Sequence, residues 1–122
     1  LAVYPSYYEP WGYTPLEAVA FHVPCLTTSL AGFGLWANKV KGADSHLADG
    51  VEVVMRDDYN FDQVANAICD TLAGLCGMSA KEVTAVRKKA ARLAEKAQWK
   101  HFIAKYEQAY AIALDNAAKR NA

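Results

Sequence analysis

Two carboxylates stand on either side of a glycine-containing turn near the start of the sequence. Glu9 and Glu17 are separated by the seven residues PWGYTPL. The first turn of a helix presents unpaired N–H groups that bind phosphate, and a carboxylate accepts hydrogen bonds from hydroxyl groups. We expect the amides of Gly12, Tyr13 and Thr14 to face a phosphate. A nucleotide sugar carries hydroxyl groups on both sides of its diphosphate, so it matches this pattern of amides and acids.

A purely structural explanation accounts for the same residues. Thr14 suits the N-cap of a helix, Pro15 suits the first helical position, and Glu17 then completes a capping box. Under this alternative Gly12 serves the turn, and its aromatic neighbours pack in the core. Both explanations place the start of a helix here, and the local pattern alone leaves them open.

The elements around this turn predict a parallel α/β sheet. Residues 1–8 are apolar and aromatic apart from Pro5, and residues 25–28 form a second short, β-rich segment. A helix is expected between them, from about Pro15 to Phe21. Strand–helix–strand alternation is typical of parallel sheets, whose ligands bind at the carboxyl ends of the strands. Because the sequence opens like the middle of a strand, we expect a fragment of a longer protein.

The middle of the chain is less regular. Residues 29–49 contain three glycines and few periodic apolar residues, which predicts mostly loop with one helical turn. Residues 50–55 predict a last strand. A cap-like Asn60 then opens a helix that we expect to end near Gly74.

Two amphipathic helices close the sequence. Ser79 and Glu82 form a capping box, and apolar residues follow at steps of three and four as far as Ala97. A second apolar and aromatic stripe runs from Trp99 to Leu114. We interpret both stripes as packing surfaces.

The composition fits one domain or a part of one. The 122 residues are 53% hydrophobic and carry no net charge, which argues against a generally basic nucleic-acid binder. No uncharged apolar run reaches the roughly 18 residues of a membrane span. Cys25, Cys69 and Cys76 include no CxxC pair, and the last two are spaced for one buried helix face. We expect reduced core thiols in a cytoplasmic protein, and the scattered histidines predict no metal site.

Charge is strongly segregated along the chain. Residues 1–78 hold three basic and nine acidic residues, a net charge of −6, whereas residues 79–122 hold ten basic and four acidic residues, a net charge of +6. We interpret the basic half as a solvated helix face. The alternative is contact with an anion or a polysaccharide phosphate. That contact would be centred on Arg87, Lys88, Lys89 and Arg92.

Three stretches resemble one enzyme family. Residues 4–17 (YPSYYEPWGYTPLE) and 27–34 (TTSLAGFG) closely resemble glycogen synthases of the animal and fungal type, and residues 99–110 (WKHFIAKYEQAY) resemble their terminal helix. These are retaining glycosyltransferases of the GT-B fold. The resemblance implies that residues 1–98 are the latter half of a nucleotide-sugar-binding, Rossmann-like domain. It implies that residues 99–122 are a C-terminal helix that packs back toward an N-terminal domain.

The resemblance also implies an activity, which is the transfer of glucose from UDP-glucose to the non-reducing end of an α-1,4-glucan with retention. Glu9 would bind hydroxyls of the donor glucose and stabilise the positive charge that develops at the anomeric carbon. The amides of Gly12, Tyr13 and Thr14 would hold the distal phosphate, and Glu17 would bind the ribose hydroxyls. The family implies no metal or other cofactor and no nucleic-acid or membrane partner. UDP or ADP as the nucleotide, and a homo-oligomer, remain open.

Three features depart from the family pattern. His22 stands where the family usually has a glycine, so the turn before Pro24 must accommodate a side chain. The arginine-rich regulatory helix of the family is only partly matched by this chain. The basic residues that neutralise the diphosphate lie upstream in the family, so we expect the 122-residue chain to be inactive by itself. The partial match consists of Lys81, Arg87, Lys89 and Arg92.

Two other hypotheses remain open. A different retaining GT-B transferase would share Glu9 and Glu17 but use another acceptor. A non-catalytic module would use the helices over residues 79–118 for assembly, and would form an oligomer that ignores nucleotide sugars.

Overall fold

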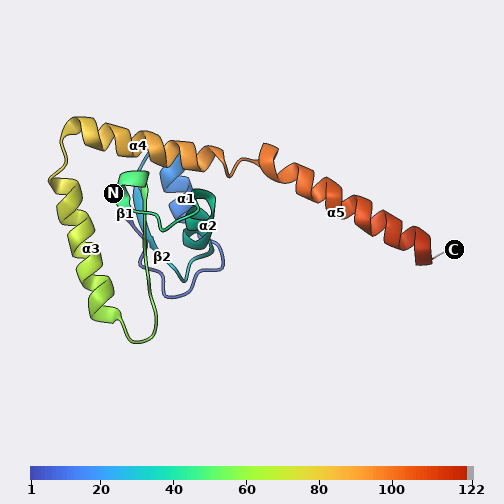
Figure 1. Cartoon of the computed structure of the whole chain (residues 1–122), viewed down its shortest axis with the longest axis horizontal. Coiled ribbons are helices and arrows are strands. Elements are labelled where there is room, and N and C mark those ends of the chain that lie inside the picture. Colours follow the sequence, from blue (N-terminus) through green and yellow to red (C-terminus); the bar gives the residue numbers. More distant parts are fainter. Residues whose placement is uncertain (121–122) are drawn as a thin grey trace.

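The computed structural model describes residues 1–120, and its three short parallel strands lie within the part of the protein that residues 1–95 form (Figure 1). These strands are β1 (Ala2–Val3), β2 (Cys25–Thr28) and β3 (Val51–Val54), and β2 pairs with both of the others. The predicted parallel sheet is confirmed, and its central strand has the predicted bounds. The first strand is shorter than the eight apolar and aromatic residues suggested.

Two helices make the connections between these strands. α1 (Tyr13–Ala20) joins β1 to β2, and α2 (Gly32–Lys41) with the 3-10 helix η1 (Leu47–Asp49) joins β2 to β3. Because each connection returns to start another parallel strand, the three strands all end at one edge of the sheet. The segments that leave this carboxyl edge are residues 4–9, 29–31 and 55–60.

Three helices cover one face of the sheet. Val19 of α1 and Phe33 of α2 pack with Cys25 of β2, and Ala90 of α4 (Ala80–Glu95) belongs to the same fully buried cluster. Figure 1 shows α4 lying across α1. Burial raises the pKa of the Cys25 thiol to about 12, so this cysteine is the protonated core thiol that the sequence predicts.

α3 (Phe61–Cys76) covers the opposite face, where Val64 packs against Leu26 of β2. We predicted that Cys69 and Cys76 would lie on this buried face, and that prediction is wrong because both are exposed. Their seven-residue spacing keeps them on one side of the helix, but that side points to solvent. α3 buries only a narrow stripe. This stripe consists of Val64, Ala67 and Ile68.

α2 corrects the prediction of a loop over residues 29–49. Glycine destabilises a helix by about 1 kcal/mol relative to alanine, so the glycines in this segment led us to predict a loop. Close packing requires the glycines here. A Cβ atom at Gly32 would lie 2.3 Å from the Pro10 carbonyl oxygen, and one at Gly34 would lie 2.4 Å from that of Thr28. The phenylalanine between them is fully buried, and its burial offsets their low propensity.

The sequence predicts helix caps at Asn60 and Ser79, and the structure confirms only the second of them. Ser79 and Glu82 form the predicted capping box, in which the Glu82 carboxylate accepts from the Ser79 amide at 2.8 Å. Asn60 precedes α3, but its side chain does not cap the helix. Its Oδ1 accepts from the Asp57 amide at 2.9 Å and its Nδ2 donates to the Met55 carbonyl at 2.9 Å. Asn60 therefore fixes the turn that follows β3.

α5 (Trp99–Arg120) extends away from the rest of the protein (Figure 1), and none of its residues is buried. The Tyr106 ring lies 5.6 Å from that of Trp99 and 6.4 Å from that of Tyr110, measured between centroids. Trp99 is nevertheless 67% exposed. The stripe predicted as a packing surface therefore has no partner within residues 1–120.

None of the helices in the described part of the chain has both the length and the apolar character that crossing a membrane requires.

Adjacent threonines in β2 provide a test of this packing. Thr27 and Thr28 are both fully buried, and Thr28 Oγ1 donates to the Ser6 carbonyl at 2.7 Å. Thr27 Oγ1 has no hydrogen-bond partner within residues 1–120. An unpaired buried hydroxyl is costly, so Thr27→Val should raise the free energy of unfolding by about 1 kcal/mol. Thr28→Val should lower it by about 1–2 kcal/mol. Urea denaturation of the two variants checks this, and equal effects would contradict it.

Candidate functional site

The loop that carries Glu9 is interlocked with the start of α2. The Glu9 amide donates to the Leu30 carbonyl at 3.2 Å, and the Gly32 amide donates to the Glu9 carbonyl at 3.1 Å. The Phe33 amide donates to the Trp11 carbonyl at 2.6 Å. These backbone bonds hold Glu9 at the carboxyl edge of the sheet, where the sequence places it.

α1 begins earlier than predicted, and Gly12 rather than Thr14 is its N-cap. Gly12 has φ 104° and ψ 73°, a left-handed conformation that strains residues with a side chain. Thr14 is therefore already helical, and Glu17 lies more than a turn from the cap. The capping-box explanation is wrong, because no side chain caps this helix. The Glu17 carboxylate is exposed and is left available for another role.

The start of α1 carries three backbone N–H groups in a row. In the described residues, the amides of Gly12, Tyr13 and Thr14 have no protein acceptor, and the next residue is Pro15, which has no N–H. The first bond of the helix is the weak one from the Leu16 amide to the Gly12 carbonyl, at 3.4 Å. Unpaired amides at a helix start attract an anion, since the helix dipole adds to their partial positive charge.

The two predicted acids lie on either side of the start of α1, with Glu9 in the connection from β1 and Glu17 within α1 itself. A Cβ atom at Gly12 would lie 3.5 Å from Cγ of Glu9, so the partly buried Glu9 side chain passes beside the start of α1. Burial raises the pKa of Tyr4, and the nearby Cys25 and the negative charge of Glu17 add to this effect. Glu17 therefore lies close enough to Tyr4, the residue after β1, to affect its pKa. Glu9 and the amides of Gly12, Tyr13 and Thr14 therefore lie around the start of α1, and Glu17 lies further along the same helix.

Two cavities lie elsewhere in the described part of the chain, and neither is lined by these residues. One of about 180 Å³ is lined by Lys41, Asp49, Lys89 and Arg92 beside α4. Another of about 310 Å³ lies next to His22 and is lined also by Leu75 and Arg87.

The basic face of α4 is partly structural. Arg87 Nε donates to the His22 carbonyl at 3.1 Å, and Lys89 Nζ donates to the Ala48 carbonyl at 2.9 Å. His22 has φ 61°, so the turn does accommodate a side chain in a left-handed conformation, as the sequence requires. The interpretation as a merely solvated face is therefore too simple, because two of its basic residues tether α4. Anion binding on this face stays a prediction.

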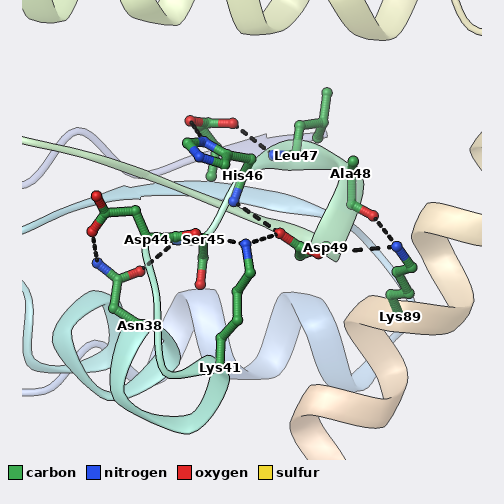
Figure 2. Close-up of polar contacts among 10 residues, drawn as sticks. Asn38, Lys41, Asp44, Ser45, His46, Leu47, Ala48, Asp49 and Lys89 are labelled. Carbon is green, nitrogen blue, oxygen red and sulfur yellow. Dashed lines mark hydrogen bonds and ion pairs between the residues drawn. The ribbon is translucent and has the colours of Figure 1, made fainter.

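Sequence reasoning missed a polar cluster at the amino edge of the sheet (Figure 2). Lys41 forms an ion pair with Asp49 and donates to the Asp44 carbonyl at 2.6 Å. Lys89 of α4 lies 3.9 Å from the same Asp49 carboxylate. The hydrogen bond from Lys41 lowers the pKa of Asp49 against the opposing effect of burial, and the charges of Lys41 and Lys89 add to it. No short sequence motif indicates this cluster, because its members come from α2, η1 and α4, which are far apart in the sequence.

A metal centre finds no support in residues 1–120. In this range no three histidine, cysteine, aspartate or glutamate side chains lie together as a metal site requires.

Comparison with known proteins places the chain among enzymes of one kind. A family model described as glycogen synthase matches residues 1–121. The liver glycogen (starch) synthase of Mus musculus is 34% identical over 121 residues, which is 96% of this chain and 16% of that protein. Isoform 1 of glycogen (starch) synthase from Saccharomyces cerevisiae is 31% identical over 117 residues, which is again 96% of this chain and 16% of that protein. The chain thus spans 16% of the length of these relatives.

Asp49 gives the cluster at the amino edge a predictable pH dependence. Its folded pKa lies below the ordinary value of 3.8, so its stabilising effect is present above about pH 4 and is lost as the pH falls through the folded pKa. Asp49→Asn should lower the free energy of unfolding by about 1 kcal/mol at neutral pH. The exposed Asp58, which forms no ion pair among the described residues, provides the control Asp58→Asn. A difference between Asp49→Asn and wild type that persists undiminished near pH 2 would refute this assignment.

Proposed function

The chain belongs to the glycogen synthase family, and on this premise we propose that it supplies part of the donor site of a glycosyltransferase. The whole protein would transfer glucose from UDP-glucose to the non-reducing end of an α-1,4-glucan, with retention of configuration. The observation that supports this most is the row of unpaired amides at the start of α1, beside the Glu9 side chain. Amides suit a phosphate, and a neighbouring carboxylate suits sugar hydroxyls.

We infer each role from the resemblance to glycogen synthases together with the position of the residue. The amides of Gly12, Tyr13 and Thr14 bind the distal phosphate of the donor. Glu9 lies on the loop before them, where its carboxylate accepts bonds from the glucose hydroxyls and stabilises the positive charge developing at the anomeric carbon. Glu17 does not cap α1, so both of its oxygens are free to accept bonds from the ribose hydroxyls.

The proposal leaves part of the chemistry to the rest of the protein. A diphosphate leaving group needs cations, and those for this site are proposed to lie in segments outside this chain. The proposed transfer uses no metal or other cofactor, and the isolated 122 residues should be inactive because the reaction needs the acceptor site as well. The free, exposed thiols of Cys69 and Cys76 suit a reducing compartment, and we place the protein in the cytoplasm.

The exposed stripe on α5 supports a second proposal, which concerns its packing partner. Trp99, Tyr106 and Tyr110 bury nothing within residues 1–120, and the relatives are about six times longer than this chain. We propose that α5 packs against another domain of the same protein. Assembly of several copies through this stripe is the alternative. Sedimentation of the whole protein, with and without UDP-glucose, distinguishes packing within one chain from assembly of several copies. If the wild type forms an oligomer, and Tyr106→Glu dissociates it without making the monomer less stable, assembly is favoured.

The proposed function is tested by Glu9→Ala in the whole protein. Transfer of labelled glucose to glycogen should fall by about 10²–10³-fold, because the charge at the anomeric carbon loses its nearest carboxylate. Glu95→Ala, which removes an exposed carboxylate at the end of α4, should leave transfer unchanged. UDP-glucose and ADP-glucose are compared as donors, and maltose as an alternative acceptor. Wild-type protein that transfers nothing to glycogen, or a Glu9→Ala variant that keeps full activity, would contradict the proposal.

A further inference from the structure

Arg56 follows β3 and reaches back across the carboxyl edge to the loop that leads into Glu9. Its Nη1 donates to the Pro5 carbonyl at 2.8 Å, across 51 positions of the sequence. Its guanidinium carbon also lies 5.3 Å from the centroid of the Tyr7 ring. One side chain thus holds two neighbouring points of the same loop, by a charge-assisted hydrogen bond and by a cation–π contact.

The backbone of Arg56 is itself fixed at the end of the sheet. Its amide donates to Ser29 Oγ at 3.0 Å, and that hydroxyl lies 3.2 Å from the sulfur of Met55. The side chain of Asn60 binds the Met55 carbonyl from the other side at 2.9 Å. Arg56 therefore starts from a rigid base, so its contacts with the loop position that loop rather than follow it.

Other bonds hold the same loop to β2 and to the segment after it. Thr28 Oγ1 donates to the Ser6 carbonyl at 2.7 Å, next to the carbonyl that Arg56 binds. Glu9 is held at its backbone by Leu30 and Gly32. The segment from Pro5 to Glu9 is thus attached to the ends of two strands. Arg56 supplies the attachment to β3.

We propose that Arg56 is a positioning residue for the Glu9 carboxylate. Resting on the role proposed above for Glu9, Arg56 fixes the loop so that this carboxylate keeps its place beside the amides at the start of α1. Arginine suits the task because its planar guanidinium can donate and stack at once, which lysine does less well. A displacement of about 1 Å at a reacting centre can cost about 10²-fold in rate.

The kinetic test compares Arg56→Met with Arg120→Met in the whole protein. Arg120 is a matched control, because its contact is with the Asn116 carbonyl of its own helix. Arg56→Met should lower kcat by about 10- to 100-fold while KM for the donor changes by less than about threefold. Arg56→Lys should recover part of the loss, because lysine keeps the charge and one donor. A rise in KM with kcat unchanged would overturn the proposal in favour of direct contact with the donor.

The double variant with Glu9→Ala tests whether Arg56 acts through Glu9. If it does, Arg56→Met should cost less than about threefold in the Glu9→Ala background, because the group that it positions is absent. An equal loss in both backgrounds would show that Arg56 acts elsewhere, and would overturn the proposal.

Hydrogen exchange of the amides in residues 5–12 gives a readout that needs no activity. Arg56→Met should speed exchange of the Ser6 and Glu9 amides by about tenfold, whereas Arg120→Met should not. If Arg56→Met speeds exchange but the wild-type protein transfers no glucose, the proposed function fails while the attachment of the loop by Arg56 stands. Unchanged exchange would defeat the inference about Arg56 even in an active enzyme.

Discussion

The arrangement of the site depends on one backbone contact, the interlock between the loop before α1 and the start of α2. Gly32 and Phe33 donate to the carbonyls of Glu9 and Trp11, and this approach leaves no room for a side chain at position 32. The same contact brings the rings of Trp11 and Phe33 to 6.3 Å between centroids. Because Glu9 and the start of α1 lie on the two ends of this loop, the interlock decides where the acid stands relative to the free amides.

The two edges of the sheet carry different kinds of polar group. At the carboxyl edge, the Glu9 carboxylate and the amides at the start of α1 lack hydrogen-bond partners in residues 1–120. At the amino edge, the Asp49 carboxylate forms ion pairs with Lys41 of α2 and Lys89 of α4, and so links α4 to the rest of the protein (Figure 2). Polar groups that have no protein partner are available to a ligand, whereas those of the amino edge are already paired, so the first edge suits binding and the second suits stability. Ligands of open parallel α/β sheets bind at this carboxyl edge.

Local patterns predicted the elements that local interactions determine. The bounds of β2 and the capping box at Ser79 follow from short-range rules. The spacing also singled out the acids and amides near the start of α1, whose binding roles stay predictions. The failures came where distant contacts decide. α2 forms because its glycines meet Pro10 and Thr28, and α1 starts at Gly12 because only glycine tolerates that conformation easily. Cys69 and Cys76 are exposed because α3 buries a narrower stripe than its sequence suggests.

The central claim is that the free amides at the start of α1 bind the phosphate of a nucleotide sugar. Amide hydrogen exchange of the whole protein, with and without saturating UDP-glucose, tests it directly at Gly12, Tyr13 and Thr14. These amides should exchange at least about tenfold more slowly when the donor is bound, because each gains an acceptor, while amides of α5 remain unchanged. Donor binding that leaves these three amides unprotected would contradict the account and would place the phosphate elsewhere.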